Sequence, residues 1–133
     1  PGMKQRGCGR IINVSSIYGL RGAANRVNYV TSKTALIGLT RSLAARLGPE
    51  GIRINAVCPG YIATPMFLPI VEGNPEARAG FERRIPLGRL GNPEEIGRLV
   101  RFLLSDEAAY VNGAVIAVDG GVTAVGGQDA LGG

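Results

Sequence analysis

Three residues in the first quarter of the chain, Ser16, Tyr29 and Lys33, have side chains that could perform acid–base chemistry together. Tyr29 and Lys33 are four positions apart, so on a helix they lie on the same face. An ammonium at ~4 Å would favour the ionised phenol by about 4 kcal/mol at an effective dielectric of ~20. Ser16 could orient a substrate oxygen beside that phenol. The combination predicts proton transfer to or from a carbonyl or alcohol oxygen.

The elements on either side of Ser16 should bring these side chains together. Residues 10–15 (RIINVS) are a short apolar run, typical of a buried strand in a parallel sheet. A polar, glycine-containing loop is expected to follow as far as about residue 28, with a helix from Tyr29. Because ligands of open parallel sheets bind at the carboxyl ends of the strands, the strand end and the first helical turn should meet at one edge.

The helix that begins at Tyr29 is predicted from its apolar spacing and from the residues that end it. Gly48-Pro49 ends the helix, since proline cannot continue it. Its leucines fall at intervals of three and four and predict one apolar stripe. The members of this stripe are Leu36, Leu39, Leu43 and Leu47.

Two further strands and two further helices are predicted downstream. The strands are residues 52–58 (IRINAVC) and 114–118 (AVIAV). The helices begin at Asn74 and Asn92, because each asparagine can cap a helix whose first residue is proline. The second helix should run to about Leu104 and bury Ile96, Leu99, Val100 and Leu103. Strands that alternate with helices in this way predict an α/β fold with a parallel sheet covered on both faces.

Composition limits the class of protein. With 133 residues, 45% of them hydrophobic and 19% charged, the chain is typical of one soluble globular domain. No apolar run approaches the ~20 residues that span a bilayer. Cys8 and Cys58 are not at metal-binding spacing and the chain has no histidine, so no metal site is predicted. Two free thiols indicate a reducing compartment, and the cytoplasm is expected.

The net charge of +5 is unevenly placed, because eight cations precede the first acidic residue, Glu50. A nucleic-acid surface is one interpretation. Solvated faces, or partners for acids elsewhere, are favoured over it, because the cations alternate with apolar residues and no set of aromatic residues accompanies them. A phosphate-bearing cofactor is a third use for some of them. The cations are Lys4, Arg6, Arg10, Arg21, Arg26, Lys33, Arg41 and Arg46.

Four motifs in order resemble the classical short-chain dehydrogenase/reductase family. They are IINVSS with Gly19 behind it, YVTSK at 29–33, NAVCPGYIAT at 55–64 and VDGG at 118–121. Ser16 precedes Tyr29 by 13 positions, the spacing that this family uses. The resemblance implies that Ser16, Tyr29 and Lys33 are the catalytic serine, tyrosine and lysine. It also implies NAD or NADP as cofactor, with Tyr29 and Lys33 at the nicotinamide ribose.

The Pro59-Gly60 turn has a physical interpretation and an implied one. Proline fixes the turn after the strand, and glycine would let the backbone approach a ligand closely. In the family, the backbone after this turn pairs with the nicotinamide carboxamide, with help from a threonine. Carried over, these positions are Ile62 and Thr64. Residues 66–86 would then cover the substrate, and Asp119-Gly120-Gly121 would be a structural and subunit-contact segment.

The family's glycine-rich phosphate loop has no counterpart here, since Gly7-Cys8-Gly9 precedes a strand instead of joining a strand to a helix. The resemblance therefore implies the C-terminal half of a Rossmann-like, doubly wound parallel sheet. Residues 1–133 would form a partial catalytic domain, ending in a frayed, glycine-rich tail at 125–133. Activity, and assembly into a tetramer, are expected of a full-length parent, with the fragment itself inactive.

Three functions remain open from the sequence. The first is an oxidoreductase that interconverts a carbonyl and a secondary alcohol in a small molecule of 3-oxoacyl thioester, sugar, polyol or steroid type, with no nucleic-acid or membrane partner. The second is an epimerase or dehydratase of the extended branch, which the Asp119-Gly120-Gly121 ending disfavours. The third is a non-catalytic remnant that acts as an interaction or nucleic-acid-binding domain.

Overall fold

The computed structural model describes residues 1–125, and its centre is a three-stranded parallel sheet in the order β1-β2-β3. The strands are β1 (Gly9–Val14), β2 (Ile52–Pro59) and β3 (Val115–Val118). The α/β fold and its three parallel strands are therefore confirmed. Most of the predicted frayed tail, residues 126–133, lies outside the described residues.

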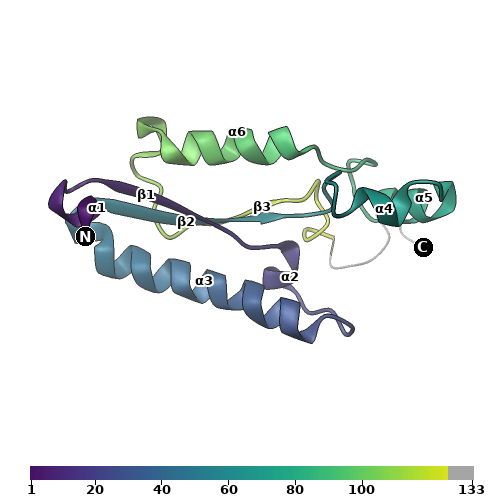
Figure 1. Cartoon of the computed structure of the whole chain (residues 1–133), viewed down its shortest axis with the longest axis horizontal. Coiled ribbons are helices and arrows are strands. Elements are labelled where there is room, and N and C mark those ends of the chain that lie inside the picture. Colours follow the sequence, from purple (N-terminus) through teal and green to yellow (C-terminus); the bar gives the residue numbers. More distant parts are fainter. Residues whose placement is uncertain (126–133) are drawn as a thin grey trace.

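Two long helices cover opposite faces of the sheet. Helix α3 (Val27–Leu47) lies on one face and α6 (Pro93–Leu104) on the other (Figure 1). Each packs its own apolar cluster on the central strand, α3 around Ile52 and Ile54 and α6 around Val57. The described residues thus form the two-faced layering of a doubly wound sheet.

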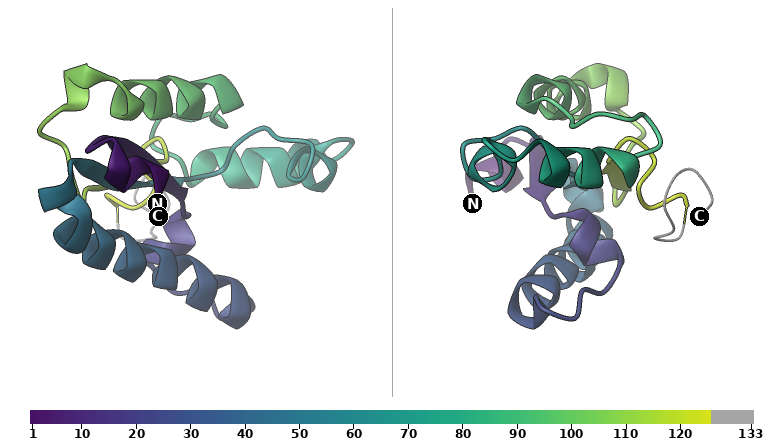
Figure 2. Two further views of the ribbon diagram at one scale, coloured as in Figure 1. Left: turned by 60° about the vertical axis from the view of Figure 1, so that its left-hand side comes forward. Right: turned by 90° about the vertical axis from the view of Figure 1, so that its right-hand side faces the viewer.

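Short helices and turns complete the described chain. They are α1 (Gly2–Gln5), α2 (Ile17–Leu20), α4 (Leu68–Val71), α5 (Pro75–Arg83) and two 3-10 turns at Gly48–Glu50 and Asp106–Ala108. Helix α2 was not predicted, since that segment was expected to be a loop. Figure 1 places α2, the start of α3, α4 and α5 toward the carboxyl ends of the strands, and Figure 2 shows α4 and α5 projecting from the two helix layers.

Strand β1 is at an edge and is less buried than its sequence predicts. It spans Gly9–Val14, one residue earlier than expected, and pairs with β2 on one side, with Ile11 opposite Ile54. Val14 is 51% exposed, whereas β2 is buried from Ile52 to Cys58. The prediction of a buried strand was wrong for β1, because no strand in the described chain covers its second edge.

Helix α3 begins two residues before the predicted start, and its buried face differs from the leucine stripe. The most buried residues are Ile37, Thr40 and Ala44. Of the predicted stripe, Leu43 and Leu47 pack partly buried against the cluster around Ile52 and Ile54, whereas Leu39 is 47% exposed. Thr40 tolerates burial because its hydroxyl donates to the Leu36 carbonyl at 2.7 Å and accepts from the Asn13 amide at 2.9 Å. The face of α3 that packs on the sheet is therefore rotated relative to the face predicted from its leucines.

The two predicted helix starts are confirmed. In α5, the Asn74 side chain accepts a hydrogen bond from the Ala77 N–H at 2.9 Å. In α6, the Glu95 carboxylate accepts one from the Asn92 N–H at 2.8 Å. These bonds satisfy groups that the first turn of a helix leaves unpaired. The predicted inner face of α6 is also present, with Leu103 buried and Ile96, Leu99 and Val100 partly buried beside it.

Candidate active site

Ser16 lies at the carboxyl end of β1, as predicted, and begins helix α2. Its side-chain oxygen accepts a hydrogen bond from the Tyr18 N–H at 3.2 Å, and the residue is only 7% exposed. Serine is a favoured residue at this capping position. Within the described residues its hydroxyl donates no hydrogen bond, so that proton remains available for an oxygen bound nearby.

Tyr29 and Lys33 lie in the first two turns of α3, at the same edge of the sheet. The Lys33 ammonium is 5.5 Å from the centre of the Tyr29 ring and faces it. The same ammonium donates to the carbonyl of Val14, the last residue of β1, at 3.0 Å. The Ser15 hydroxyl donates to the Lys33 carbonyl at 2.8 Å, which makes a second link between β1 and α3. Tyr29 is 39% exposed, so a small molecule can reach it.

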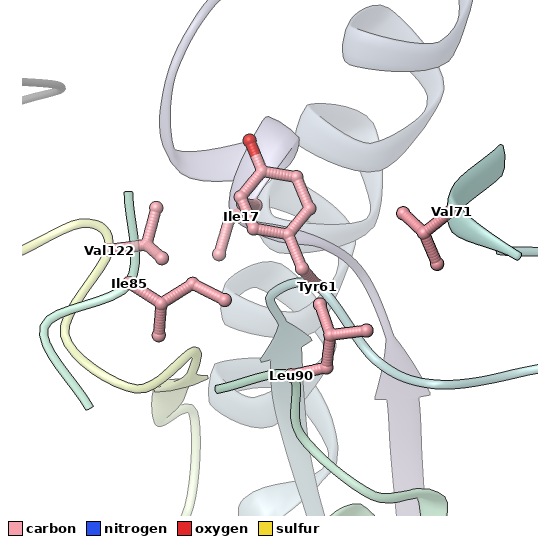
Figure 3. Close-up of a cluster of buried hydrophobic side chains, with 6 residues drawn as sticks. All are labelled: Ile17, Tyr61, Val71, Ile85, Leu90 and Val122. Carbon is pink, nitrogen blue, oxygen red and sulfur yellow. The ribbon is translucent and has the colours of Figure 1, made fainter. Parts of the chain in front are cut away.

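Two tyrosines that sequence reasoning missed connect this edge to the turn after β2. Tyr18 stands edge-on to Tyr29, with ring centres 6.3 Å apart, and its hydroxyl is 3.4 Å from that of Tyr61. Tyr61 is buried in an apolar cluster with Ile17, Val71, Ile85, Leu90 and Val122 (Figure 3). Burial raises the pKa of Tyr61, and the hydrogen bond with Tyr18 raises it further. In the sequence, the feature that could have pointed to Tyr61 is its position directly after the Pro59-Gly60 turn.

The structure shows one requirement for glycine at position 60, which is separate from the predicted approach to a ligand. A Cβ atom at this position would lie 2.7 Å from the Cβ of Asp119 and 2.8 Å from its Cα. The Gly60 N–H also donates to the Val118 carbonyl at 3.0 Å. The close approach of the backbone is therefore to the end of β3. The predicted contact of Pro59 and Gly60 with a cofactor stays a prediction.

Ile62 and Thr64 present free donors beyond that turn. Ile62 forms a single parallel bridge with Gly91, in which Gly91 donates to the Tyr61 carbonyl and Ala63 donates to the Gly91 carbonyl. The Ile62 N–H points away from this bridge and makes no hydrogen bond within residues 1–125, and neither does the Thr64 hydroxyl. A cavity of about 110 Å³ lies beside Ile62, bounded also by Val118 and Gly120.

The Asp119 carboxylate is held by its own turn. It accepts hydrogen bonds from the Gly121 N–H at 2.9 Å, the Thr123 N–H at 2.8 Å and the Thr123 hydroxyl at 2.6 Å. Burial acts to raise the pKa of Asp119, but these hydrogen bonds outweigh it and hold the pKa below its usual range. Both oxygens are used in shaping the turn after β3, which is a structural task.

Other kinds of site find little support in the described part of the chain. No group of three or more His, Cys, Asp or Glu side chains there is placed to hold a metal ion. Both cysteines are free, and burial raises the pKa of the Cys58 thiol. None of the described helices has the length and apolar character needed to cross a membrane.

Comparison with known proteins finds a matching family model and relatives that are named as reductases or dehydrogenases. Residues 1–123 match the family model described as enoyl-(acyl carrier protein) reductase. The 3-oxoacyl-[acyl-carrier-protein] reductase FabG of Thermotoga maritima is 48% identical over 120 residues, which cover 90% of this chain and 47% of that protein. The cis-4-hydroxycyclohexanecarboxylate dehydrogenase of Sinomonas cyclohexanicum is 48% identical over 124 residues, covering 92% and 48%.

A solved structure has the same fold as this chain. The structure of ElxO with NADP bound superposes with a TM-score of 0.86 at 32% identity, covering 92% of this chain and 50% of that one. The chain therefore spans about half the length of the relatives it matches.

Proposed function

Because this chain belongs to the short-chain dehydrogenase/reductase family, we propose that the protein containing it is an NAD- or NADP-dependent oxidoreductase that interconverts a carbonyl and a secondary alcohol. The observation that carries the proposal is the placement of Ser16, Tyr29 and Lys33 at one edge of the sheet, with the ammonium 5.5 Å from the phenol ring. Edges of this kind are where open parallel sheets bind their ligands.

In the direction of reduction, a dinucleotide held at this edge would supply a hydride to the carbonyl carbon. Tyr29 donates its phenolic proton to the carbonyl oxygen, so that hydride and proton together convert the ketone into the alcohol. The Lys33 ammonium stabilises the phenolate that remains, until solvent returns the proton. The Ser16 hydroxyl donates to the same substrate oxygen and holds it near Tyr29. In oxidation each of these proton transfers runs in reverse.

The residues present suit a nicotinamide group. An amide needs both donors and acceptors, and the Ile62 N–H and Thr64 hydroxyl are donors without a partner in residues 1–125. Lys33 has three ammonium protons, of which the Val14 carbonyl takes one, so the others can reach ribose hydroxyls. Tyr29, Pro59 and Gly60 would complete the contacts on this side of the cofactor.

The other contacts to the dinucleotide are proposed to lie outside these residues. The chain spans about half the length of its relatives, and Gly7 precedes β1 while Gly9 is its first residue, so neither lies between a strand and a helix. We therefore expect these residues to form the C-terminal part of the catalytic domain and to turn over no substrate alone. The whole protein is expected to be cytoplasmic and to form a tetramer. Light scattering of the purified protein would test the tetramer.

Replacement of Tyr29 by phenylalanine in the whole protein tests the proposed chemistry. Loss of the proton donor should reduce kcat about 10²-fold or more, measured from the absorbance of the reduced nicotinamide with a panel of ketones and 3-oxoacyl thioesters. Tyr110→Phe is the matched control, because Tyr110 is fully exposed and makes no aromatic or hydrogen-bonded contact in the described structure. A Tyr29→Phe enzyme within a few-fold of the parent contradicts the proposal.

The cations that precede Glu50 also support a second candidate function, nucleic-acid binding without catalysis. If the whole protein reduces no carbonyl with either dinucleotide and is retained on DNA in a salt-dependent manner, the non-catalytic, nucleic-acid-binding function replaces the enzymatic one.

A further inference from the structure

We propose that the substrate carries an anionic group, a carboxylate or a phosphate, and that Arg21 and Arg26 bind it beside Tyr29. This inference rests on the proposed oxidoreductase function, because it names the substrate class of the same site. Two arginines gathered on one tyrosine next to the catalytic phenol are the observation behind it.

Tyr18 places both arginines near the site. The guanidinium carbons of Arg21 and Arg26 are each 5.6 Å from the centre of the Tyr18 ring. The edge of the same ring meets Tyr29, with 6.3 Å between ring centres. A single aromatic side chain therefore separates the two guanidinium groups from the phenol that transfers the proton.

Neither arginine has an acidic partner in the described chain. The ion pairs found there join Lys4 to Glu50, Arg10 to Asp106, Arg78 to Glu82 and Arg89 to Glu95. Arg21 donates instead to the neutral hydroxyl of Tyr61 at 3.3 Å, and its buried Nε has no acceptor. A buried donor without a partner is unfavourable, so this guanidinium is poised for an acceptor that the described protein does not supply.

Asp119 is the acidic residue whose charge interacts with Arg21, but it forms no ion pair with it, and its oxygens accept hydrogen bonds from Gly121 and Thr123. Two guanidinium groups lie at the Tyr18 ring against this one carboxylate, so the net charge beside Tyr18 is positive. Because Tyr18 and Tyr61 shield one side of it from water, the attraction for an anion is stronger there than at an open surface.

Arginine is the side chain suited to such a ligand. Its planar guanidinium forms two parallel hydrogen bonds with a carboxylate or phosphate, and it stacks on aromatic rings as both arginines do here. A neutral thioester offers only weak acceptors to these groups. A small oxo acid or an oxo phosphate therefore fits this edge better than a neutral ketone.

Matched pairs of substrates test the inference in the whole protein. One pair is 4-oxocyclohexanecarboxylate and its methyl ester, and the other is dihydroxyacetone phosphate and dihydroxyacetone. Acetoacetyl-N-acetylcysteamine serves as the neutral thioester. We expect kcat/KM to be about tenfold or more higher for the anion of at least one pair, the size of a charge-assisted hydrogen bond, and to fall as salt is raised.

Charge-removing variants locate the effect. Arg26→Gln should abolish most of the preference by raising KM for the anion, with kcat for the neutral substrate retained, and Arg26→Lys should restore part of it. Arg41→Gln is the matched control, since Arg41 is exposed on α3 and makes no ion pair within residues 1–125. It should leave the preference unchanged.

Two failures can be told apart. The inference is overturned, while the oxidoreductase function stands, if the enzyme shows no preference for the anionic substrates or prefers the neutral thioester, and if Arg26→Gln leaves the relative kcat/KM values of these substrates unchanged. If no substrate in any arm is reduced with either dinucleotide, the proposed function fails and the inference fails with it.

Discussion

Asn55 offers the sharpest test of how the central strand is held to β3. It lies on the central strand β2 with no exposed surface. Its amide nitrogen donates to the Val111 carbonyl at 2.9 Å, and its oxygen accepts from the Ala114 N–H at 2.9 Å. One side chain thus fixes both ends of the turn that leads into β3.

Replacement of Asn55 by alanine removes both hydrogen bonds at once. It leaves the Ala114 N–H without a partner, at a cost of about 1–3 kcal/mol, whereas the Val111 carbonyl loses one hydrogen bond and keeps the Arg53 guanidinium at 3.2 Å. We expect a loss of about 2–4 kcal/mol in the free energy of unfolding, a large share of the 5–15 kcal/mol typical of a domain. Asn55→Asp should also destabilise at neutral pH, since a buried carboxylate can accept from Ala114 but cannot donate to Val111.

Urea unfolding of the whole protein, followed by circular dichroism, measures these changes. Asn25→Ala is the control, because Asn25 is exposed and makes no side-chain hydrogen bond in the described structure; it should fall within ~0.5 kcal/mol of the parent. An Asn55→Ala protein as stable as this control would refute the assignment of these two hydrogen bonds.

Further predictions concern the turn after β2 and the start of α6. Gly60→Ala should lower the free energy of unfolding by about 1–3 kcal/mol, because its methyl group would overlap Asp119; an unchanged urea midpoint would show that the strand ends are not this close. Asp119→Asn should cost about 1–2 kcal/mol in the same assay, since an amide nitrogen cannot accept from Thr123, whereas unchanged stability would show these bonds to be dispensable. The Arg89 guanidinium and the Asn92 N–H lower the pKa of Glu95 to about 2, so the stability that this carboxylate adds should be present above its unfolded pKa of 4.5 and be lost as the pH falls toward 2. Glu95→Gln should therefore flatten acid unfolding over that window, and coincident acid curves for the two proteins would contradict it.

The local sequence alone determined where most elements begin and end. Gly48-Pro49 marks the end of α3, and Asn74 and Asn92 mark the starts of α5 and α6, because these residues act on the backbone within one turn. The order of strands and helices was sufficient for the parallel sheet. It also placed Ser16 and Tyr29 at one edge, since a strand end and the start of the next helix must meet there.

Only the tertiary structure decided which faces are buried and which distant residues touch. Leu39 is exposed and Thr40 is buried because the rotation of α3 depends on the shape of the sheet beneath it, including Asn13, and not on its own leucines. Gly60 is needed because β3, almost sixty residues later in the chain, passes against it. Burial and close contact belong to pairs of elements, so a periodic pattern in one element can indicate an apolar face but cannot identify the neighbour that covers it.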